Sequence, residues 1–471
     1  MPEPSWMVIV EVAWVLLVAG FMVLQRRSAP ATLAWILTLA FLPLVGIAVY
    51  SLIGPRRFDH EKKHRIAAIA KVRRSSAVTE TDELVAPSQL ARMLARAVGR
   101  AGRIRSGQVR AFFDGRALFD ALEEAIAGAQ HHIHLEYYIW EPDRLGTRLR
   151  DRLVERARAG VEVRVLVDAV GSWNARRSFW RPLREAGAEV RCFNENTLFR
   201  IRTHMLNFRS HRKIAVIDGE IGFTGGMNVS EVHTSEFSGE RAWRDTHAEL
   251  RGEVVRGLSF VFFEDWHYAG GDAPELAAYF SDRSPVHAEK PSAIQIVSSG
   301  PDEGVDAIHK LFISSITGAT SRVQLTTPYF VPDEPILTAL TIASLGGVDV
   351  SLLVPRAGDQ PLVAAAARTY YPDLLKAGAK IYELDHPVLH AKTLVVDDVA
   401  VVGTANTDNR SFRLNFEVVA VVYDHRLADT LAKQFEADLA TAEPVALESL
   451  RRLGLLERLI GSVARLFSPL L

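Results

Sequence analysis

Two short stretches of the chain carry histidine, lysine and aspartate at the same spacing, and each stretch runs on into glycine and asparagine. The two copies are His211, Lys213 and Asp218, followed later in the chain by His390, Lys392 and Asp397. A single His-x-Lys would carry little weight, whereas two full copies at one spacing rarely arise by chance. The repetition predicts one site that is assembled from two halves of the chain.

The paired histidines and lysines suit chemistry at an anionic, tetrahedral phosphorus centre. The lysines, the side-chain amides of Asn228 and Asn406, and the backbone N–H groups of the nearby glycine-rich turns would neutralise and orient phosphate oxygens. One histidine would attack phosphorus, while the other protonates the leaving alcohol and then acts as base for the incoming one. This chemistry requires no metal and no other cofactor.

Strand geometry gives the members of each motif different duties. Each motif is expected to open a strand (214–217 and 394–396), where residues two apart share a face, so the histidine and lysine point the same way. The aspartate lies an odd number of residues after the histidine, and we expect it to brace the strand end through hydrogen bonds. A carboxylate that orients the imidazole must come from elsewhere, and Asp245 and Glu417 are the candidates at similar downstream positions.

The elements that position these motifs also repeat. Beyond about residue 105, strand-like and helix-like segments alternate, which indicates an α/β fold. The predicted strand 132–140 of the first half corresponds to 323–331 of the second, and the elements around them match in order and type. The repeat predicts two homologous α/β domains, 105–272 and 293–446, joined by a linker at 273–292.

Two apolar segments near the N-terminus are expected to form a transmembrane helical hairpin within residues 1–55. Residues 31–54 carry no charge and residues 6–24 carry only Glu11, and about 20 apolar residues suffice for a crossing. A cleaved signal peptide is the alternative for the first segment, but no Lys or Arg precedes it. Eight basic residues follow the hairpin within 56–74, at the start of the linker 56–104, against two between the segments. This difference places the large domains on the cytoplasmic side, near the lipid surface.

Two further segments leave alternatives open. Residues 198–209 are an insertion that the second half lacks, and their mixture of basic and large apolar side chains suits either a lipid-facing loop or an ordinary surface loop. Residues 447–471 are expected to form a C-terminal amphipathic helix, which would lie on the bilayer or pack against the second domain.

Composition narrows the classes of protein. The 471 residues favour more than one domain, and a formal net charge of −1 does not suit a polycation that seeks nucleic acid. Cys192 is the only cysteine, so neither an intrachain disulfide nor a cysteine-rich metal site can form.

The doubled motif, each copy followed by Gly-Gly-x-Asn or Gly-Thr-x-Asn, resembles the phospholipase D superfamily. The hairpin segment 37–46, the Pro-Tyr-Phe-Val-Pro element at 328–332 and the ending 466–471 make the whole chain similar to the bacterial cardiolipin synthases. This resemblance implies two phospholipase D-like domains related by a pseudo-twofold axis, with the motifs at their interface.

The same resemblance implies a reaction and a location. Two phosphatidylglycerol molecules would be condensed to cardiolipin and glycerol through a phosphatidyl-histidine, on the cytoplasmic side of the bacterial inner membrane. The partners would be phosphatidylglycerol and membrane phospholipid. All six motif residues would be catalytic, with His211 as nucleophile and His390 as acid and base.

Three other functions are weighed against this one. A phospholipid hydrolase of the same superfamily would use the same six residues, with water as the acceptor. A nuclease fits less well, because no aromatic and basic stripe marks a nucleic-acid groove. A membrane adaptor without activity would be expected to have lost one motif, and this chain retains both.

Overall fold

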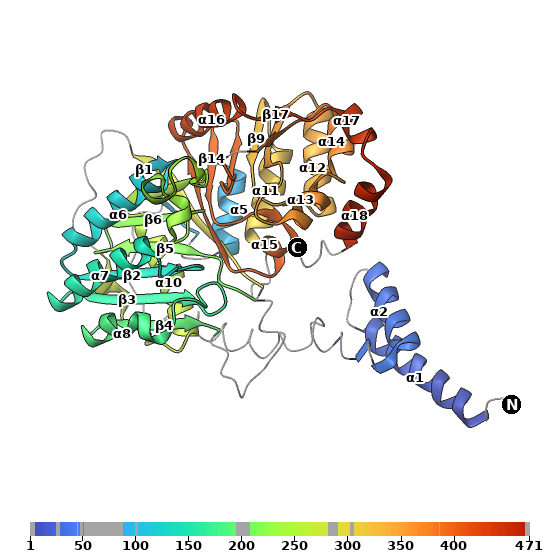
Figure 1. Cartoon of the computed structure of the whole chain (residues 1–471), viewed down its shortest axis with the longest axis horizontal. Coiled ribbons are helices and arrows are strands. Elements are labelled where there is room, and N and C mark those ends of the chain that lie inside the picture. The colour runs from blue at the N-terminus through green and yellow to red at the C-terminus, as the bar shows by residue number, and fades with distance from the viewer. Residues whose placement is uncertain are drawn as a thin grey trace. The chain divides into compact units, whose positions relative to one another are not determined.

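The computed structural model describes residues 5–24, 29–44, 46–47, 50, 88–98, 102–194, 208–280, 291–301, 306–385 and 387–466. They belong to two compact units, one with the N-terminal helices α1 and α2 and one with everything described from residue 88 onward (Figure 1). The larger unit is built on a 15-stranded mixed sheet and carries both motifs.

The first half of this sheet has the strand order β4-β3-β2-β5-β6-β7-β1. Its strands are β1 (Ile104–Phe112), β2 (His132–Tyr137), β3 (Glu162–Asp168), β4 (Glu189–Phe193), β5 (Lys213–Ile217), β6 (Ile221–Gly225) and β7 (His247–Arg251). Its main helices are α6 (Gly115–Gly128), α7 (Arg144–Arg158), α8 (Arg177–Glu185) and α10 (Val255–Tyr268).

The second half repeats this order as β12-β11-β9-β13-β14-β16-β8, with the short β17 added at its edge. Its strands are β8 (Ser292–Ser299), β9 (Arg322–Thr326), β11 (Asp349–Pro355), β12 (Lys380–Leu384), β13 (Thr393–Val396), β14 (Val399–Gly403), β16 (Glu417–Tyr423) and β17 (Glu443–Pro444). Its main helices are α11 (Ala307–Thr317), α12 (Glu334–Leu345), α13 (Pro361–Ala367), α14 (Tyr371–Ala377) and α16 (His425–Leu439). The α/β repeat that the sequence predicts is therefore present.

The two halves share one continuous sheet. The equivalent strands β1 and β8 pair antiparallel, with Ile104 opposite Gln295 and Gly107 opposite Ser292. Antiparallel pairing of equivalent strands is the arrangement that a twofold axis through the junction would produce. Of the predicted linker 273–292, residues 281–290 lie outside the described part of the chain.

Helices cover both faces of the sheet because the central strands are apolar on both sides. In β5, Ala215 and Ile217 join the core that contains residues of α6, α7 and α8. Ile214 and Val216, which alternate with them, join the core that contains α10. The first motif is thus carried on a strand that is buried on both faces, which fixes its position.

Three predicted elements differ from the structure. The strand expected at 323–331 is interrupted after β9, and only the two residues of β10 (Phe330–Val331) resume it, because Pro328 lacks the N–H that the ladder needs. Part of the predicted linker 56–104 forms helix α5 (Gln89–Val98), which buries Ala91 and Leu94 and packs against β8 and α11 of the second half.

The expected C-terminal helix is divided into α17 (Leu447–Arg451) and α18 (Leu455–Leu466). The Glu457 side chain accepts a hydrogen bond from the N–H of Gly454 at 2.9 Å, at the start of α18. Phe467 and Leu470, near the end of the predicted helix 447–471, lie outside the described residues.

The N-terminal unit is a pair of packed helices, α1 (Ser5–Val23) and α2 (Ala29–Phe41). Val18, Met22 and Leu39 form its small core, and the indole N–H of Trp14 donates to the Leu39 carbonyl at 3.0 Å. Within the stretches that the structure describes, no helix combines the length and hydropathy needed to cross a bilayer. The end of the second predicted span, the basic residues 56–74 and most of the insertion 198–209 fall outside those stretches.

The two motif aspartates brace the ends of their strands, as strand parity predicts. The Asp218 carboxylate accepts hydrogen bonds from the backbone N–H groups of residues 130, 131 and 132 at 2.8–2.9 Å. Asp397 accepts from the N–H groups of residues 320, 321 and 322 in the same way. Both aspartates adopt the left-handed backbone conformation, with φ of 52° and 50°. Each turn thereby positions its carboxylate against the start of the neighbouring strand.

We predict that Asp218→Ala lowers the free energy of unfolding by about 2 kcal/mol, because three backbone donors lose a charged acceptor and alanine is strained at positive φ. Denaturant unfolding of the full-length protein measures the change. Asp218→Asn keeps one acceptor oxygen and tolerates the left-handed backbone, so its loss should be smaller. Asp398→Ala, at the exposed position beside Asp397, is the matched control. Equal stability of Asp218→Ala and the control would contradict the bracing role.

Candidate active site

A parallel β-bridge between the two halves brings His211 to Glu417. Ser210 pairs with Phe416, so the residue after each is placed side by side. The N–H of His211 donates to the Phe416 carbonyl at 2.9 Å. Both carboxylate oxygens of Glu417 then lie 3.0 Å from Nδ1 of His211.

A second bridge repeats this arrangement for the other histidine. Arg244 pairs with Leu389, and the N–H of His390 donates to the Arg244 carbonyl at 2.8 Å. Oδ2 of Asp245 consequently lies 2.6 Å from Nδ1 of His390. The carboxylates that the sequence singled out do contact the imidazoles, but each contacts the histidine of the opposite half.

These contacts define which ring nitrogen is left for chemistry. A carboxylate beside Nδ1 favours the tautomer in which Nδ1 carries the proton and donates it to the carboxylate. The Nε2 atoms of His211 and His390 are then free to act as nucleophile or base. Both imidazoles are nearly buried, with 8% and 6% of each residue exposed, so solvent competes little for these hydrogen bonds.

The two motif lysines are buried beside the histidines. Nζ of Lys213 donates to the carbonyl of His211 at 2.8 Å, and Nζ of Lys392 donates to the carbonyl of His390. Nζ of Lys392 also lies 3.0 Å from Nδ1 of His390. Because Nδ1 carries a proton that it donates to Asp245, it cannot accept a hydrogen bond from Lys392, and the two atoms are only in close contact. Each ammonium group retains donors that an anionic ligand could take up.

Burial and mutual repulsion weaken the positive charges of the site. Burial and then the charge of Lys392 lower the pKa of Lys213 to about 7. Burial lowers the pKa of Lys392 to about 8. Burial also lowers the pKa of both His211 and His390 to about 4, against the pull of their carboxylates. Before substrate arrives, the histidines are therefore neutral and the lysines are close to losing their charge near neutral pH.

The two carboxylates remain charged in spite of their burial. Burial by itself would raise the pKa of Asp245, but Lys392 and His390 hold it well below its usual range. Burial likewise opposes the shift at Glu417, and His211 outweighs it to keep that pKa low. An anion at each Nδ1 stabilises the imidazolium that forms whenever Nε2 takes up a proton.

The two halves support their carboxylates differently. Glu417 accepts from the Thr404 hydroxyl at 2.5 Å and from the Asn415 amide at 3.2 Å. Gly226 stands where the first half would need the counterpart of Thr404, and a Cβ atom there would lie only 2.0 Å from Oδ1 of Asp245. The glycine of the first motif is thus required for space, whereas the threonine of the second supplies a hydrogen bond.

Aromatic rings enclose the histidines on each side. The Tyr138 ring meets His211 edge-on, with centroids 5.1 Å apart. Trp243 and His233 lie 5.3 and 5.5 Å from the His390 ring. No motif or spacing in the sequence marks these three residues, although Trp243 lies only two residues before Asp245.

One group of three possible metal ligands lies in this region, namely His233, Asp245 and His390, whose donor atoms fall within 4.8 Å of one another. Asp245 and His390 already share a hydrogen bond, so an ion would compete directly with the contact that orients the imidazole.

Arg212 is a buried site residue that the sequence analysis missed. Its guanidinium donates to the carbonyls of Glu417 at 3.1 Å and Ser299 at 3.3 Å, and it forms an ion pair with Asp265 of α10. Because Arg212 lies between the histidine and the lysine of the motif, strand parity directs it to the opposite face. It ties the first motif to the second half from behind the site.

The two motif asparagines are buried near the site, with scaffold contacts of their own. Oδ1 of Asn228 accepts from the N–H of Ile139 at 3.3 Å. The N–H of Asn406 donates to the Ser411 hydroxyl at 3.1 Å, and its Oδ1 has no hydrogen-bond partner among the described residues. A direct contact of either amide with phosphate remains a prediction.

The repeated strand order, with one His/Lys motif from each half meeting at the junction, defines the class of two-motif phospholipase D-like proteins. The solved phosphatidylserine synthase of Haemophilus influenzae has this fold, with a TM-score of 0.60 over 81% of this chain and 100% of that one, at 13% identity. At that identity the likeness concerns the fold alone.

Sequence comparison narrows the class further. A family model described as "Cardiolipin synthase, PLD-like domain" matches residues 122–256 and 312–439. The cardiolipin synthase of Alkalihalophilus pseudofirmus is 37% identical over 99% of this chain and 95% of its own length. That of Geobacillus thermodenitrificans is 39% identical over 97% and 92%. The chain belongs to the cardiolipin synthase family of the phospholipase D superfamily.

We predict that Glu417→Gln and Asp245→Asn each lower kcat on the order of 100-fold or more, because a neutral amide neither fixes the tautomer nor stabilises the imidazolium. Steady-state turnover of the purified protein measures the loss. Asp349→Asn, which neutralises an exposed carboxylate paired with Lys380, is the control and should retain activity. Folded variants with undiminished kcat would contradict the orienting role.

Proposed function

We propose that the protein transfers a phosphatidyl group between two phosphatidylglycerol molecules, yielding cardiolipin and glycerol. The observation that carries this proposal is the pair of buried histidines, each with a carboxylate on Nδ1 and a lysine beside it, drawn from opposite halves of one sheet. Such a pair supplies a nucleophile and a proton donor for the same phosphodiester. Membership in the cardiolipin synthase family supports a phospholipid as the substrate.

In the first step, Nε2 of His211 attacks phosphorus and the bond to the glycerol headgroup breaks. His390, as the imidazolium, gives its Nε2 proton to the leaving oxygen, so that free glycerol departs and a phosphatidyl-His211 remains. The negative charge of the bound phosphodiester raises the pKa of His390 from its low value in the empty site, which allows it to carry that proton. Lys213 and Lys392 stabilise the charge that develops on the phosphate oxygens.

In the second step, the headgroup hydroxyl of another phosphatidylglycerol is the acceptor. His390, now neutral, takes the hydroxyl proton as the oxygen attacks phosphorus, and the bond to Nε2 of His211 breaks. Cardiolipin leaves, and His390 is again protonated for the next cycle. The burial of both imidazoles favours a lipid alcohol over bulk water as the acceptor.

We also propose that α1 and α2 hold the enzyme at the cytoplasmic face of the bacterial inner membrane. The two helices pack through few side chains and leave large apolar ones exposed, among them Trp6, Ile9, Leu16 and Leu17. The basic residues at 56–74 of the sequence favour the cytoplasmic side.

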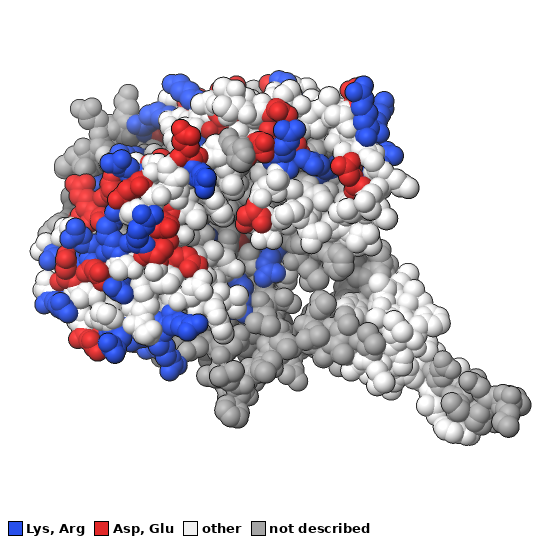
Figure 2. Space-filling model, viewed as in Figure 1, with Lys and Arg blue, Asp and Glu red and all other residues white. Residues whose placement is uncertain are grey.

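A phospholipid hydrolase is the alternative that uses the same residues. A nuclease is less well supported, since Figure 2 shows Lys and Arg interspersed with Asp and Glu over the face that it displays.

We predict that the purified full-length protein, given phosphatidylglycerol in mixed micelles, forms cardiolipin and free glycerol in equal amounts. Mass spectrometry of the lipid and an enzymatic assay of glycerol measure the two products. Phosphatidic acid as the sole lipid product would show that the protein is a hydrolase and not a transferase.

The same assay with phosphatidylglycerol labelled in its phosphate distinguishes the histidines. His390→Asn should form labelled protein slowly, because the leaving glycerol is no longer protonated, and should retain the label, because no base activates the acceptor. His211→Asn should carry no label, because only the nucleophile forms the P–N bond. Label on the His211→Asn protein would show that His390 is the nucleophile and His211 the acid and base.

We predict that kcat/KM falls as the pH rises through about 7 to 8. Lys213 and Lys392 carry charge below their lowered pKa values of about 7 and 8 and lose it above them, so the affinity of the free enzyme for an anionic phosphodiester declines. Bound phosphate stabilises the charged lysines, so kcat should decline less. A pH profile of both parameters tests this, and a flat kcat/KM into the alkaline range would contradict it.

A further inference from the structure

Helix α18 packs with its small side chains inward and its large apolar side chains outward. Gly461 and Ala464 are the buried residues of the helix, and a Cβ on Gly461 would lie 3.0 Å from the Ala365 carbonyl of α13. The outer face carries six side chains that are between 45% and 85% exposed: Leu455, Leu456, Leu459, Ile460, Val463 and Leu466. A helix that packed only against protein would present the opposite pattern. A contiguous exposed apolar face of this kind marks a contact with lipid or with another protein.

A cavity of about 490 Å³ lies beside this helix, between α13 and α14 on one side and α17 and α18 on the other. Much of its wall is apolar, formed by Pro372, Leu447, Leu450, Leu453 and Ile460. Such a wall with a few polar groups is typical of ligand sites.

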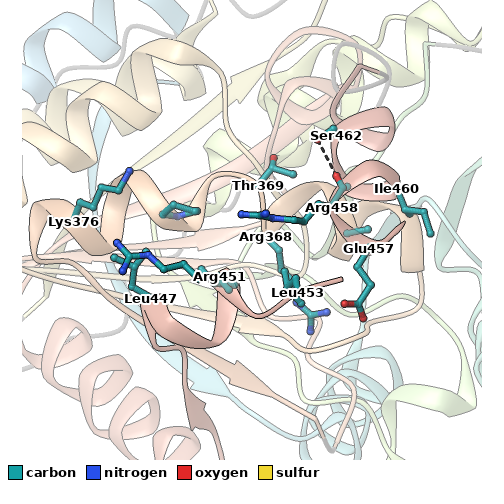
Figure 3. Close-up of a pocket in the computed structure, with 14 residues that line it drawn as sticks. Arg368, Thr369, Lys376, Leu447, Arg451, Leu453, Glu457, Arg458, Ile460 and Ser462 are labelled. Carbon is teal, nitrogen blue, oxygen red and sulfur yellow. Dashed lines mark hydrogen bonds between the residues drawn. The ribbon is translucent and has the colours of Figure 1, made fainter. Parts of the chain in front are cut away.

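The charged groups of the wall are mostly basic. Arg368, Lys376, Arg451 and Arg458 line the cavity, against Glu457 as the one acidic residue of the lining. Figure 3 shows Lys376 and Arg451 toward one end of the cavity, Arg368 and Arg458 nearer its middle, and Glu457 toward the other end. Figure 2 likewise shows basic side chains at the edge of the molecule that carries α17.

These basic residues differ in whether a carboxylate of the protein already pairs with them. Arg368 is held by both oxygens of Glu383 at 2.9 and 3.0 Å. Arg451 and Arg458 form no ion pair with any residue that the structure describes, and both are exposed. Two uncommitted guanidinium groups above an apolar wall match a phosphate attached to acyl chains.

We propose that this cavity and the outer face of α18 form a second lipid site, which binds an anionic membrane phospholipid through its phosphate and contacts its acyl chains. The site is built entirely from the C-terminal half and contains none of the motif residues. It depends on the proposed function only in that the enzyme works at a membrane. Arg451 and Arg458 hold the phosphate, and α18 lies in the interface with Leu459 among the lipids.

The test uses an environment-sensitive fluorophore on L459C, in a Cys192→Ser background, in the full-length protein reconstituted into nanodiscs. Discs of phosphatidylcholine alone are compared with discs that also contain phosphatidic acid, which offers the catalytic site no phosphodiester to cleave. We expect a blue shift of the emission that is clearly larger with phosphatidic acid. R451Q/R458Q should reduce this extra shift by about half or more, and R451K/R458K should restore it.

The matched control is R116Q/R181Q, two exposed arginines on helices of the first half, which should leave the shift unchanged. Equal shifts in both kinds of disc would overturn the anionic site. A fluorophore that stays in water in both kinds of disc would also overturn the proposal. So would a shift that appears in detergent and grows with protein concentration, because it would show that a second copy of the chain covers the outer face of α18. Because the signal is independent of turnover, a failure here is distinct from a failure of the proposed phosphatidyl transfer.

Discussion

The exchange of carboxylates between the two halves is the interaction on which the site depends. Glu417 of the second half holds His211 of the first, and Asp245 of the first half holds His390 of the second. All four side chains are largely or fully buried where the halves meet. Each imidazole is therefore oriented by its carboxylate only while the two halves are joined.

The sheet provides the rigidity that this exchange needs. The pairing of β1 with β8 joins the two repeats into one sheet. The β-bridges at Ser210 and Arg244 pair the backbone of the first half with that of the second. Arg212 adds a further tie behind the site, through Asp265 and two backbone carbonyls. Hydrogen bonds of this kind hold the histidines at fixed separation and orientation, which is the main requirement for two-step transfer at one phosphorus atom.

The environments of the two histidines are similar in plan and different in detail. Glu417 is supported by Thr404 and Asn415, while Asp245 is fitted against Gly226 and lies near His233. Identical motifs can therefore take unequal roles, because the groups around them set the ease with which each imidazole is protonated. The buried lysines favour an anionic substrate, since their positive charges are stabilised most when such a substrate fills the site.

The sequence by itself determined the repeat, the motif residues, the bracing aspartates and the two candidate carboxylates, since each follows from local spacing and strand parity. It also indicated two domains, but continuity of the sheet depends on the pairing of β1 with β8, which no local pattern records. The break before β10 was foreseeable from Pro328, whereas helix α5 was hidden within a basic segment. Only the tertiary structure decided that Glu417 serves His211 and Asp245 serves His390. Contacts between residues so far apart in the chain are set by how the two halves join, and local side-chain periodicity carries no information about that junction.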